Sequence, residues 1–319
     1  MPIALLKFPT DLRREVFQQC DPFQLYALSK CSKRTQRSIK LGGTRNWKLQ
    51  FWGGNLIVAS VDGLRYKFGK TENPDEYFKT QHAGRYVKYM GIQWGDAFNM
   101  FFYLLETFRI RVVETLGIYY GNLEKFLNAA RELIERKIEV EVFHIEDTSE
   151  VKDMEKLMRL LNQMNISQKF TCFQKFSSNF HHNLEKFPKE ILIHYSFWFT
   201  IDQLLECSCV RIELYGSTLS NQDIDLFLQK WKSPGSFPNL RWLQIESENI
   251  DNKSPILGMI PPIEHNHPPR TRVSLGADSS ILNPVGVTKE DGTVGWMKVE
   301  LATRSTLKFL VFNPIAPRI

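Results

Sequence analysis

The sequence predicts an α+β / α/β protein with three short N-terminal helices, an irregular αβ repeat region and a C-terminal β-hairpin region. From about residue 110, strand-like segments alternate with helical ones, and this alternation implies parallel strands joined by crossovers. Near the C-terminus, Asp291-Gly292 separates two alternating runs, which is a strong signal for a β-hairpin. These two patterns, with the apolar helical segment at the start, define the expected class.

The expected organisation has three parts. Residues 1–41 form the helices, 42–110 a β-meander and a connecting segment, and 111–319 the αβ repeat domain that ends in β-strands. Within the last part, residues 247–285 are rich in Pro, Asn and Ser, which predicts a surface loop.

The composition is that of a folded protein with ordinary charge. The chain has 319 residues, 43% of them hydrophobic, enough for one large domain and a small one. Five cysteines without regular spacing do not indicate a disulfide framework, so free thiols in a reducing compartment are expected. No apolar run is long enough to cross a membrane, and the opening "MPIALLKF" lacks the basic start of a signal peptide. We expect an intracellular protein, cytoplasmic, nuclear or both, without a membrane partner.

The N-terminal helices are predicted from their start signals. Pro9-Thr10 opens the first helix, and Asp21-Pro22 opens the second, with Asp as N-cap and Pro at the first helical position. The second helix, "FQLYALSKC", is apolar nearly all round, which predicts burial on more than one side.

The third helical piece is basic. Cations recur at spacings of three and four, which predicts one charged face made of Lys30, Lys33, Arg34, Arg37 and Lys40. A solvated face, an acidic protein partner and nucleic acid all fit this pattern. Nucleic acid is the least favoured partner, because the net charge of +6 is mild and no aromatic residues are interleaved with these cations.

A weak internal repeat supports the αβ repeat region. The segments "DMEKLMRLL" (153–161) and "DIDLFLQKW" (223–231) share the same order of Asp, apolar and spacer positions. An irregular solenoid resembling a leucine-rich-repeat arc therefore fits better than a doubly wound sheet, although the consensus repeat spacing is absent. Trp231 and Trp242 are expected in the core of this region.

No combination of residues predicts catalysis, a metal or a cofactor. Cys207 and Cys209, His181-His182, and His265-x-His267 lack the spacing that brings four ligands together, and each is interpreted as structural. The sequence contains no phosphate-binding glycine loop and no nucleophile elbow. We therefore expect a protein that is not an enzyme, while a hydrolase that uses Cys207, Cys209 or a His/Asp pair brought together by folding stays open as a third interpretation.

The segment "LLKFPTDLRREVFQQCDPFQLYALSKCSKRTQRSIK" (5–40) resembles an F-box. The family pattern places an apolar residue before Pro, then a spaced Leu and an apolar pair, then Asp-Pro, then Leu and Leu-Ser, and finally a basic, serine-containing stretch. The matching positions are Leu6, Phe8, Pro9, Leu12, Val16, Phe17, Asp21, Pro22, Leu25, Leu28, Ser29, Ser32, Lys33, Arg34 and Ile39. Phe8 departs from the commonest Leu before Pro, and Cys31-Ser32 replaces a more usual Val-Cys or Val-Ser.

The rest of the chain resembles the F-box-associated region of the large nematode F-box families. The resemblance is carried by "ELYGSTLSNQDIDLFLQKWKSPGSFPNLRWLQIES" (213–247) and "GVTKEDGTVGWMKVE" (286–300). Residues 42–110 contribute little to it.

This resemblance implies a substrate-recognition subunit of a Skp-cullin-F-box ubiquitin ligase. The F-box would bind the Skp-type adaptor, and through it a cullin-RING complex, while the C-terminal domain binds a protein target that the sequence does not identify. The adaptor-binding residues implied are Leu6, Phe8, Pro9, Leu12, Val16, Phe17, Pro22, Leu25, Leu28, Lys33 and Arg34. The alternative is an interaction scaffold outside any ligase, in which the N-terminal helices pack on the protein's own repeat domain.

Overall fold

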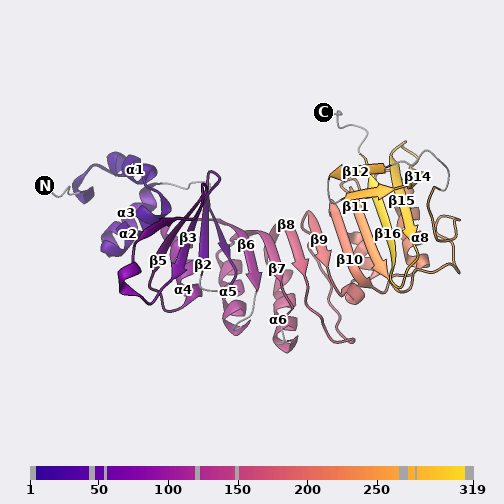
Figure 1. The fold of residues 1–319 in the computed structure, drawn as a ribbon, viewed down its shortest axis with the longest axis horizontal. Coiled ribbons are helices and arrows are strands. Elements are labelled where there is room, and N and C mark those ends of the chain that lie inside the picture. The colour runs from indigo at the N-terminus through magenta and orange to yellow at the C-terminus, as the bar shows by residue number, and fades with distance from the viewer. Residues whose placement is uncertain are drawn as a thin grey trace. The chain divides into compact units, whose positions relative to one another are not determined.

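The computed structural model describes residues 5–42, 47–53, 56–118, 123–147, 151–265, 272–276 and 279–312. The chain forms two compact units, Met1–Asn165 and Ile166–Ile319 (Figure 1). Each unit combines helices with a mixed sheet, which confirms the α+β class. None of the helices in these ranges has the length and apolarity needed to cross a bilayer.

Unit 1 begins with the three short helices that the sequence predicts. They are α1 (Thr10–Gln19), α2 (Pro22–Cys31) and α3 (Lys33–Ile39), flanked by the 3-10 turns η1 (Leu5–Lys7) and η2 (Lys40–Gly42). The Asp21 side chain accepts a hydrogen bond from the backbone N–H of Gln24, and the Gln24 side chain accepts one from the backbone N–H of Asp21. This reciprocal cap, with Pro22 at the first helical position, makes α2 begin where the sequence indicates.

The sheet of unit 1 contains the predicted meander. Its strands are β1 (Lys48–Phe51), β2 (Leu56–Val61), β3 (Leu64–Lys70), β4 (Thr80–His82), β5 (Val87–Ile92), β6 (Val112–Ile118) and β7 (Glu139–Ile145). Their spatial order is β7-β6-β1-β2-β3-β5-β4. The β1–β2 and β2–β3 pairs are antiparallel, as the tight turns predict, whereas β3–β5, β1–β6 and β6–β7 are parallel.

Helices α4 (Ala97–Thr107), α5 (Leu123–Glu135) and α6 (Val151–Leu161) complete unit 1, with the 3-10 turn η3 (Pro74–Glu76). Asp96 caps α4 by accepting from the backbone N–H groups of Phe98 and Asn99. Phe101 on α4 stacks on Phe51 of β1 with their ring centroids 4.8 Å apart, and both side chains are fully buried. Residues 70–100 have a mixed sequence pattern that predicts no clear element. The structure places β4, β5 and the start of α4 there.

Unit 2 begins with four parallel strands. They are β8 (Asn165–Cys172), β9 (Glu190–Ile193), β10 (Arg211–Ser217) and β11 (Trp242–Ser247). The predicted parallel pairing is confirmed for β8–β9, β9–β10 and β10–β11. The connections carry the 3-10 turn η4 (Ser196–Trp198) and helices α7 (Ile201–Glu206) and α8 (Asn221–Lys232). Trp231 and Trp242 are buried, as expected.

The sheet of unit 2 continues with antiparallel strands in the order β11-β16-β15-β14. These are β14 (Val285–Thr288), β15 (Val294–Glu300) and β16 (Ser305–Val311). Gly292 lies between β14 and β15 with φ of +84°, a left-handed conformation that glycine adopts without steric cost. The adjacent Asp291 side chain accepts a 2.9 Å hydrogen bond from the backbone N–H of Thr293, which supports the turn.

A small second sheet lies inside the segment expected to be a loop, residues 247–285. Strands β12 (Arg272–Gly276) and β13 (Ser279–Leu282) pair antiparallel there. Ile281 of β13 packs with Trp242 and Leu310, and Val273 of β12 packs against the same cluster. The expectation of a plain loop was wrong here, because strands of five and four residues are too short for their apolar alternation to stand out from the sequence.

Candidate functional site

Helix α1 presents apolar side chains that the chain itself does not cover. The Leu12 side chain is 43% exposed, and Val16, one helical turn later, is half-buried. Phe17 points inward and is 1% exposed. Residues four apart lie on the same side of a helix, so Leu12 and Val16 form one open apolar strip.

Helix α2 packs on the sheet of unit 1 through aromatic rings. The Phe23 ring contacts Tyr66 and Phe68 of β3 edge to face, with centroids 5.2 and 5.0 Å apart. The Tyr26 ring meets Phe68 at 5.5 Å in the same manner. Edge-to-face pairs add to the free energy gained by burying the rings, so α2 is held firmly on β3. Figure 1 shows α2 beside β5 and β3.

Hydrogen bonds tie α2 to α4. The Tyr103 hydroxyl donates to Ser29 Oγ at 2.6 Å, and the Ser29 hydroxyl donates to the backbone carbonyl of Tyr26 at 2.6 Å. Burial raises the pKa of the Tyr103 phenol, so this group keeps its proton and stays a donor at neutral pH. The Lys30 ammonium lies over the Tyr103 ring, 3.8 Å from the centroid.

Helix α3 is joined to α4 by polar contacts. Gln36 Nε2 donates to Thr107 Oγ1 at 3.2 Å, and Lys40 Nζ pairs with the Glu106 carboxylate at 2.5 Å. The predicted five-cation face on one helix was wrong, because α2 ends at Cys31 and α3 spans only Lys33–Ile39. The N-cap at Ser32 separates the two helices, so Lys30 belongs to α2 and Lys40 to η2.

The residues that the F-box resemblance implies for adaptor binding fall into three groups. The exposed ones are Pro9, Leu12, Lys33 and Arg34. The half-buried ones are Leu6, Phe8, Val16 and Leu28. The buried ones are Phe17, Pro22 and Leu25. The buried group is covered by the chain itself, whereas the first two groups keep surface for a partner.

In unit 2, a row of rings crosses adjacent strands. The His194 ring lies 4.3 Å from Phe173 and 4.8 Å from Tyr215, measured between centroids. Along β10 the buried Ile212 and Leu214 alternate with Tyr215, so the ring row lies on the opposite sheet face from these core residues. This aromatic row is partly exposed, and side chains of this kind supply much of the binding energy at protein interfaces.

Polar groups adjoin the aromatic row. Gln244 Nε2 donates to the Tyr215 hydroxyl at 3.4 Å, and that hydroxyl donates to Glu213 Oε2 at 3.3 Å. Burial, together with the Glu213 charge, raises the pKa of Tyr215 to about 12. Burial lowers the pKa of His194, which favours the neutral imidazole. The face therefore combines neutral rings with fixed hydrogen-bonding groups, a chemistry suited to binding.

The structure places Cys207 and Cys209 together, among the cysteines and histidines singled out in the sequence. A hydrogen bond with Cys207 and burial raise the pKa of the Cys209 thiol, which also donates to the Pro188 carbonyl at 2.9 Å. Both cysteines line a cavity of about 210 Å³. A thiol held protonated is a poor nucleophile, which disfavours Cys209 as the nucleophile of the hydrolase interpretation. Within the described ranges, no three His, Cys, Asp or Glu side chains gather as a metal site requires; His267 lies outside them.

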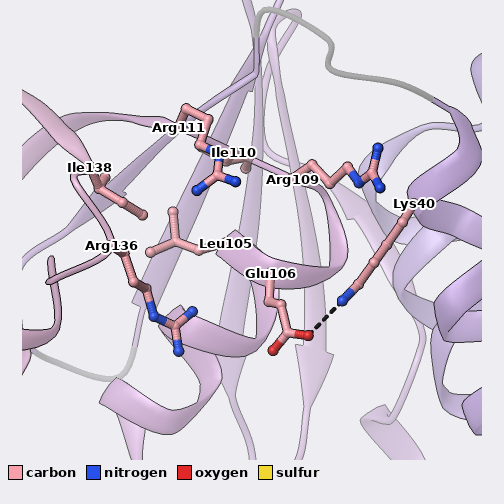
Figure 2. A pocket seen from close by; sticks show the side chains of 8 residues that line it. All are labelled: Lys40, Leu105, Glu106, Arg109, Ile110, Arg111, Arg136 and Ile138. Carbon is pink, nitrogen blue, oxygen red and sulfur yellow. Dashed lines mark hydrogen bonds and ion pairs between the residues drawn. The ribbon is translucent and has the colours of Figure 1, made fainter.

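A basic pocket in unit 1 was missed by sequence reasoning. It has a volume of about 420 Å³ and is lined by Lys40, Leu105, Glu106, Arg109, Ile110, Arg111, Arg136 and Ile138 (Figure 2). These residues come from η2, the end of α4, the connection to β6 and the region between α5 and β7. The closely spaced arginines of "RIR" at 109–111 were the one local signal.

Comparison with known families identifies two regions of the chain. Residues 5–42 match the F-box domain model, and residues 173–245 match the F-box associated model. Neither is a model of a catalytic family. No curated protein and no solved structure gives a significant match to the chain. The first match covers α1–α3 with η1 and η2, and the second covers the aromatic row.

Proposed function

Because the chain is an F-box protein with an F-box-associated C-terminal region, we propose that it is a substrate-recognition subunit of a Skp-cullin-F-box ubiquitin ligase. Its N-terminal helices bind the Skp-type adaptor, and its C-terminal region binds a target protein. Joining the two raises the effective concentration of the ubiquitin donor at the lysines of the target. The chemistry of ubiquitin transfer belongs to the partner subunits.

The observation that carries the proposal is the open apolar strip of Leu12 and Val16 inside the F-box segment. Exposed apolar strips with a polar surround are typical of interaction sites. In this proposal the exposed and half-buried groups contact the adaptor, while Phe17, Pro22 and Leu25 hold the helices in shape. Lys33 and Arg34 steer an acidic partner, which affects the rate of association and register more than affinity.

The target surface in this proposal is the aromatic row of Phe173, His194 and Tyr215, within the F-box-associated match. Rigid rings lose little conformational entropy on binding. The hydrogen-bonding groups of Glu213 and Gln244 would orient the bound target. The leucine-rich-repeat-like arrangement of residues 111–319 belongs to the same proposal. Repeat arrays of this type offer extended surfaces to protein ligands.

The alternative function is a scaffold that works outside any ligase. The packing of Phe23 and Tyr26 on Phe68 shows α2 covered by the protein's own sheet, although the contact is with β3 of the meander and not with the repeat region of residues 111–319. The two functions differ in what α1 does. A ligase subunit needs the Leu12 strip for the adaptor, whereas a scaffold binds no adaptor.

Capture of a purified Skp-type adaptor on the immobilised full-length chain tests the proposal. In the Leu12→Asp variant a carboxylate would be buried without a partner at the interface, so capture should fall at least tenfold. Gln18→Asp is the matched control, since it adds the same charge at an exposed position of α1. We expect the wild type and Gln18→Asp to capture the adaptor equally.

The same experiment separates the alternatives. Circular dichroism establishes that each variant is folded before capture is measured. Adaptor binding that fails for the folded wild-type chain would contradict the ligase proposal and support the scaffold. Equal loss in both aspartate variants would show that charge, and not the Leu12 strip, governs binding.

A further inference from the structure

The basic pocket gathers more positive charge than its own carboxylate neutralises. Among the described residues, four cationic side chains line it, Lys40, Arg109, Arg111 and Arg136, together with one carboxylate, that of Glu106. Glu106 pairs with Lys40 at 2.5 Å, and Figure 2 shows its carboxylate between Lys40 and Arg136. Concentrating like charges around a cavity creates a positive potential that attracts anions.

The remaining cations differ in how they are occupied. Arg136 is paired with Glu132 one turn earlier on α5, with Nε and Nη2 at 2.7 and 2.5 Å from Oε1. The guanidinium groups of Arg109 and Arg111 have no side-chain hydrogen bond or ion pair within the described part of the chain. Their donors remain available to a ligand, and a planar guanidinium binds phosphate or carboxylate with two parallel hydrogen bonds.

The backbone places Arg109 at the rim by a helix-ending motif. The Ile110 N–H donates to the Leu105 carbonyl at 2.9 Å, and the Arg109 N–H donates to the Glu106 carbonyl at 3.3 Å. This is the Schellman ending of α4, in which the residue at φ of +54°, Arg109, occupies the position where glycine is most common. A side chain at this position carries a conformational cost that glycine would avoid.

The floor of the pocket is apolar. Leu105, Ile110 and Ile138 are all buried, and none of the described residues that line the cavity is aromatic. An anionic group on a short apolar stem fits such a floor and rim, whereas single-stranded nucleic acid would need stacking rings along a cationic groove.

We propose that this pocket binds an anionic side chain, phosphorylated or carboxylate, on a segment of a partner protein. Arg109 and Arg111, whose guanidinium groups lie on different sides of the pocket (Figure 2), each offer a binding point for the anion, and the stem of the ligand rests on Leu105 and Ile138. Glu106, from within the chain, neutralises Lys40 of the same rim and so lowers the positive potential that the anion meets. The inference rests on the proposed function in that it names the chemistry of a protein ligand, but the described lining residues of the pocket do not include Leu12 or Val16, and the pocket is tested separately.

Fluorescence anisotropy of the full-length chain with three labelled peptide libraries tests the proposal. The libraries are nine residues long with the same degenerate flanks, and their central residue is phosphoserine, glutamate or alanine. We expect an anionic library to bind at least tenfold more tightly than the alanine library. The tighter of the phosphoserine and glutamate libraries identifies the source of the anion.

Three variants assign the binding to the pocket. Arg111→Gln and Arg109→Gly should each weaken binding about tenfold, because each removes a charge-assisted pair of hydrogen bonds. Arg109→Gly also suits the left-handed backbone, so a loss of binding there does not come from unfolding. Glu106→Gln removes the neutralising carboxylate and should strengthen binding. Arg85→Gln, at an exposed arginine of the β4–β5 connection, is the matched control and should stay within twofold of the wild type.

Other outcomes overturn the inference. The alanine library binding as tightly as the anionic ones would contradict it, as would equal losses in Arg111→Gln and Arg85→Gln. Tighter binding of a labelled twelve-nucleotide single strand, lost in Arg111→Gln, would assign the pocket to nucleic acid instead. Adaptor capture is measured on the same Arg111→Gln sample, and the pocket variants should capture the adaptor normally. This measurement separates a failure of the pocket inference from a failure of the ligase proposal.

Discussion

The Tyr103 hydroxyl of α4 lies 2.6 Å from Ser29 Oγ of α2 and donates a hydrogen bond to it. These residues are 74 positions apart in the chain, so this contact joins the F-box segment to the sheet domain. Ser29 donates in turn to the Tyr26 carbonyl, and the Tyr26 ring packs on Phe68 of β3. The F-box segment is therefore one packed body with the sheet of unit 1, and only the side chains that this packing leaves open are accessible to the adaptor that we propose.

Removing the Tyr103 hydroxyl should destabilise this contact. Tyr103→Phe loses one partly buried hydrogen bond, so the free energy of unfolding should fall by about 1 kcal/mol. Urea denaturation followed by tryptophan fluorescence measures the change. Tyr86→Phe is the control, because the Tyr86 side chain is 57% exposed. An equal change in both variants would mean that the Tyr103–Ser29 bond contributes nothing.

Two leucines of the F-box should differ sharply in their effect on stability. Leu25 is 5% exposed and Leu12 is 43% exposed. Leu25→Ala leaves a cavity in a packed region and should lower the free energy of unfolding by about 2–5 kcal/mol. Leu12→Ala should change it by less than about 0.5 kcal/mol, because the side chain is largely in solvent already. Urea midpoints measure both, and similar losses would contradict the division between inner and outer residues.

Glycine at position 109 should stabilise the protein. Arg109 has φ of +54°, where an L side chain is strained and glycine is not. Arg109→Gly should therefore raise the free energy of unfolding by about 0.5–1 kcal/mol, after allowing for the greater freedom of glycine in the unfolded chain. Arg85→Gly, on an exposed connection, supplies the comparison. A lower urea midpoint for Arg109→Gly would show that the arginine side chain stabilises the fold.

The stability of the protein should depend on pH through His182. Burial lowers the pKa of this imidazole to about 4, and its buried Nε2 has no hydrogen-bond partner within the described residues. In the unfolded chain the same group takes up a proton below about pH 6.5. The unfolded state therefore binds more protons between these values, and the free energy of unfolding falls as the pH drops from about 6.5 to 4.

The His182 contribution lost over this range should be on the order of 2 kcal/mol. His182→Phe preserves a ring beside Trp198, whose centroid lies 5.8 Å from that of His182. Urea midpoints measured between pH 4 and 7 should vary less in this variant than in the wild type. Identical pH profiles would show that His182 is not the group responsible.

The cysteines should react with a thiol reagent in two groups. Cys31 is exposed and Cys20 is partly exposed, whereas Cys172, Cys207 and Cys209 are buried. Brief treatment of the folded protein with N-ethylmaleimide should label Cys31 first, and mass spectrometry of its peptides identifies the labelled residues. The buried thiols should react only after denaturation. Rapid labelling of Cys207 or Cys209 in the folded protein would revive the hydrolase interpretation.

The parts of the fold that the sequence predicted depend on local signals. The Asp21-Pro22 start is read correctly because the cap is formed by residues three apart. The parallel strands β8–β11 follow from alternating strand and helix patterns, which require crossovers. By contrast, β12 and β13 were missed, since their pairing depends on a core around Trp242 that long-range contacts assemble.

The candidate site divides in the same way. The F-box pattern identified the segment around Leu12 as a candidate binding site, because all positions of the pattern lie within one continuous segment of the sequence. It did not separate Leu12 from Leu25, since both match the pattern and only the packing of α2 on β3 buries the second. The basic pocket was missed, as its charges come from positions as far apart as Lys40 and Arg136.

The sequence by itself determined the three N-terminal helices, the meander, the parallel strands of unit 2 and the F-box and F-box-associated regions. Each of these depends on residue types at short spacings, which sterics, capping and side-chain alternation convert directly into local structure. Only the tertiary structure decided which F-box side chains remain open, that His194 lies between Phe173 and Tyr215, and that four cations surround one cavity. The physical reason is that burial and electrostatic environment depend on which distant segments pack together, and local residue patterns do not specify that packing.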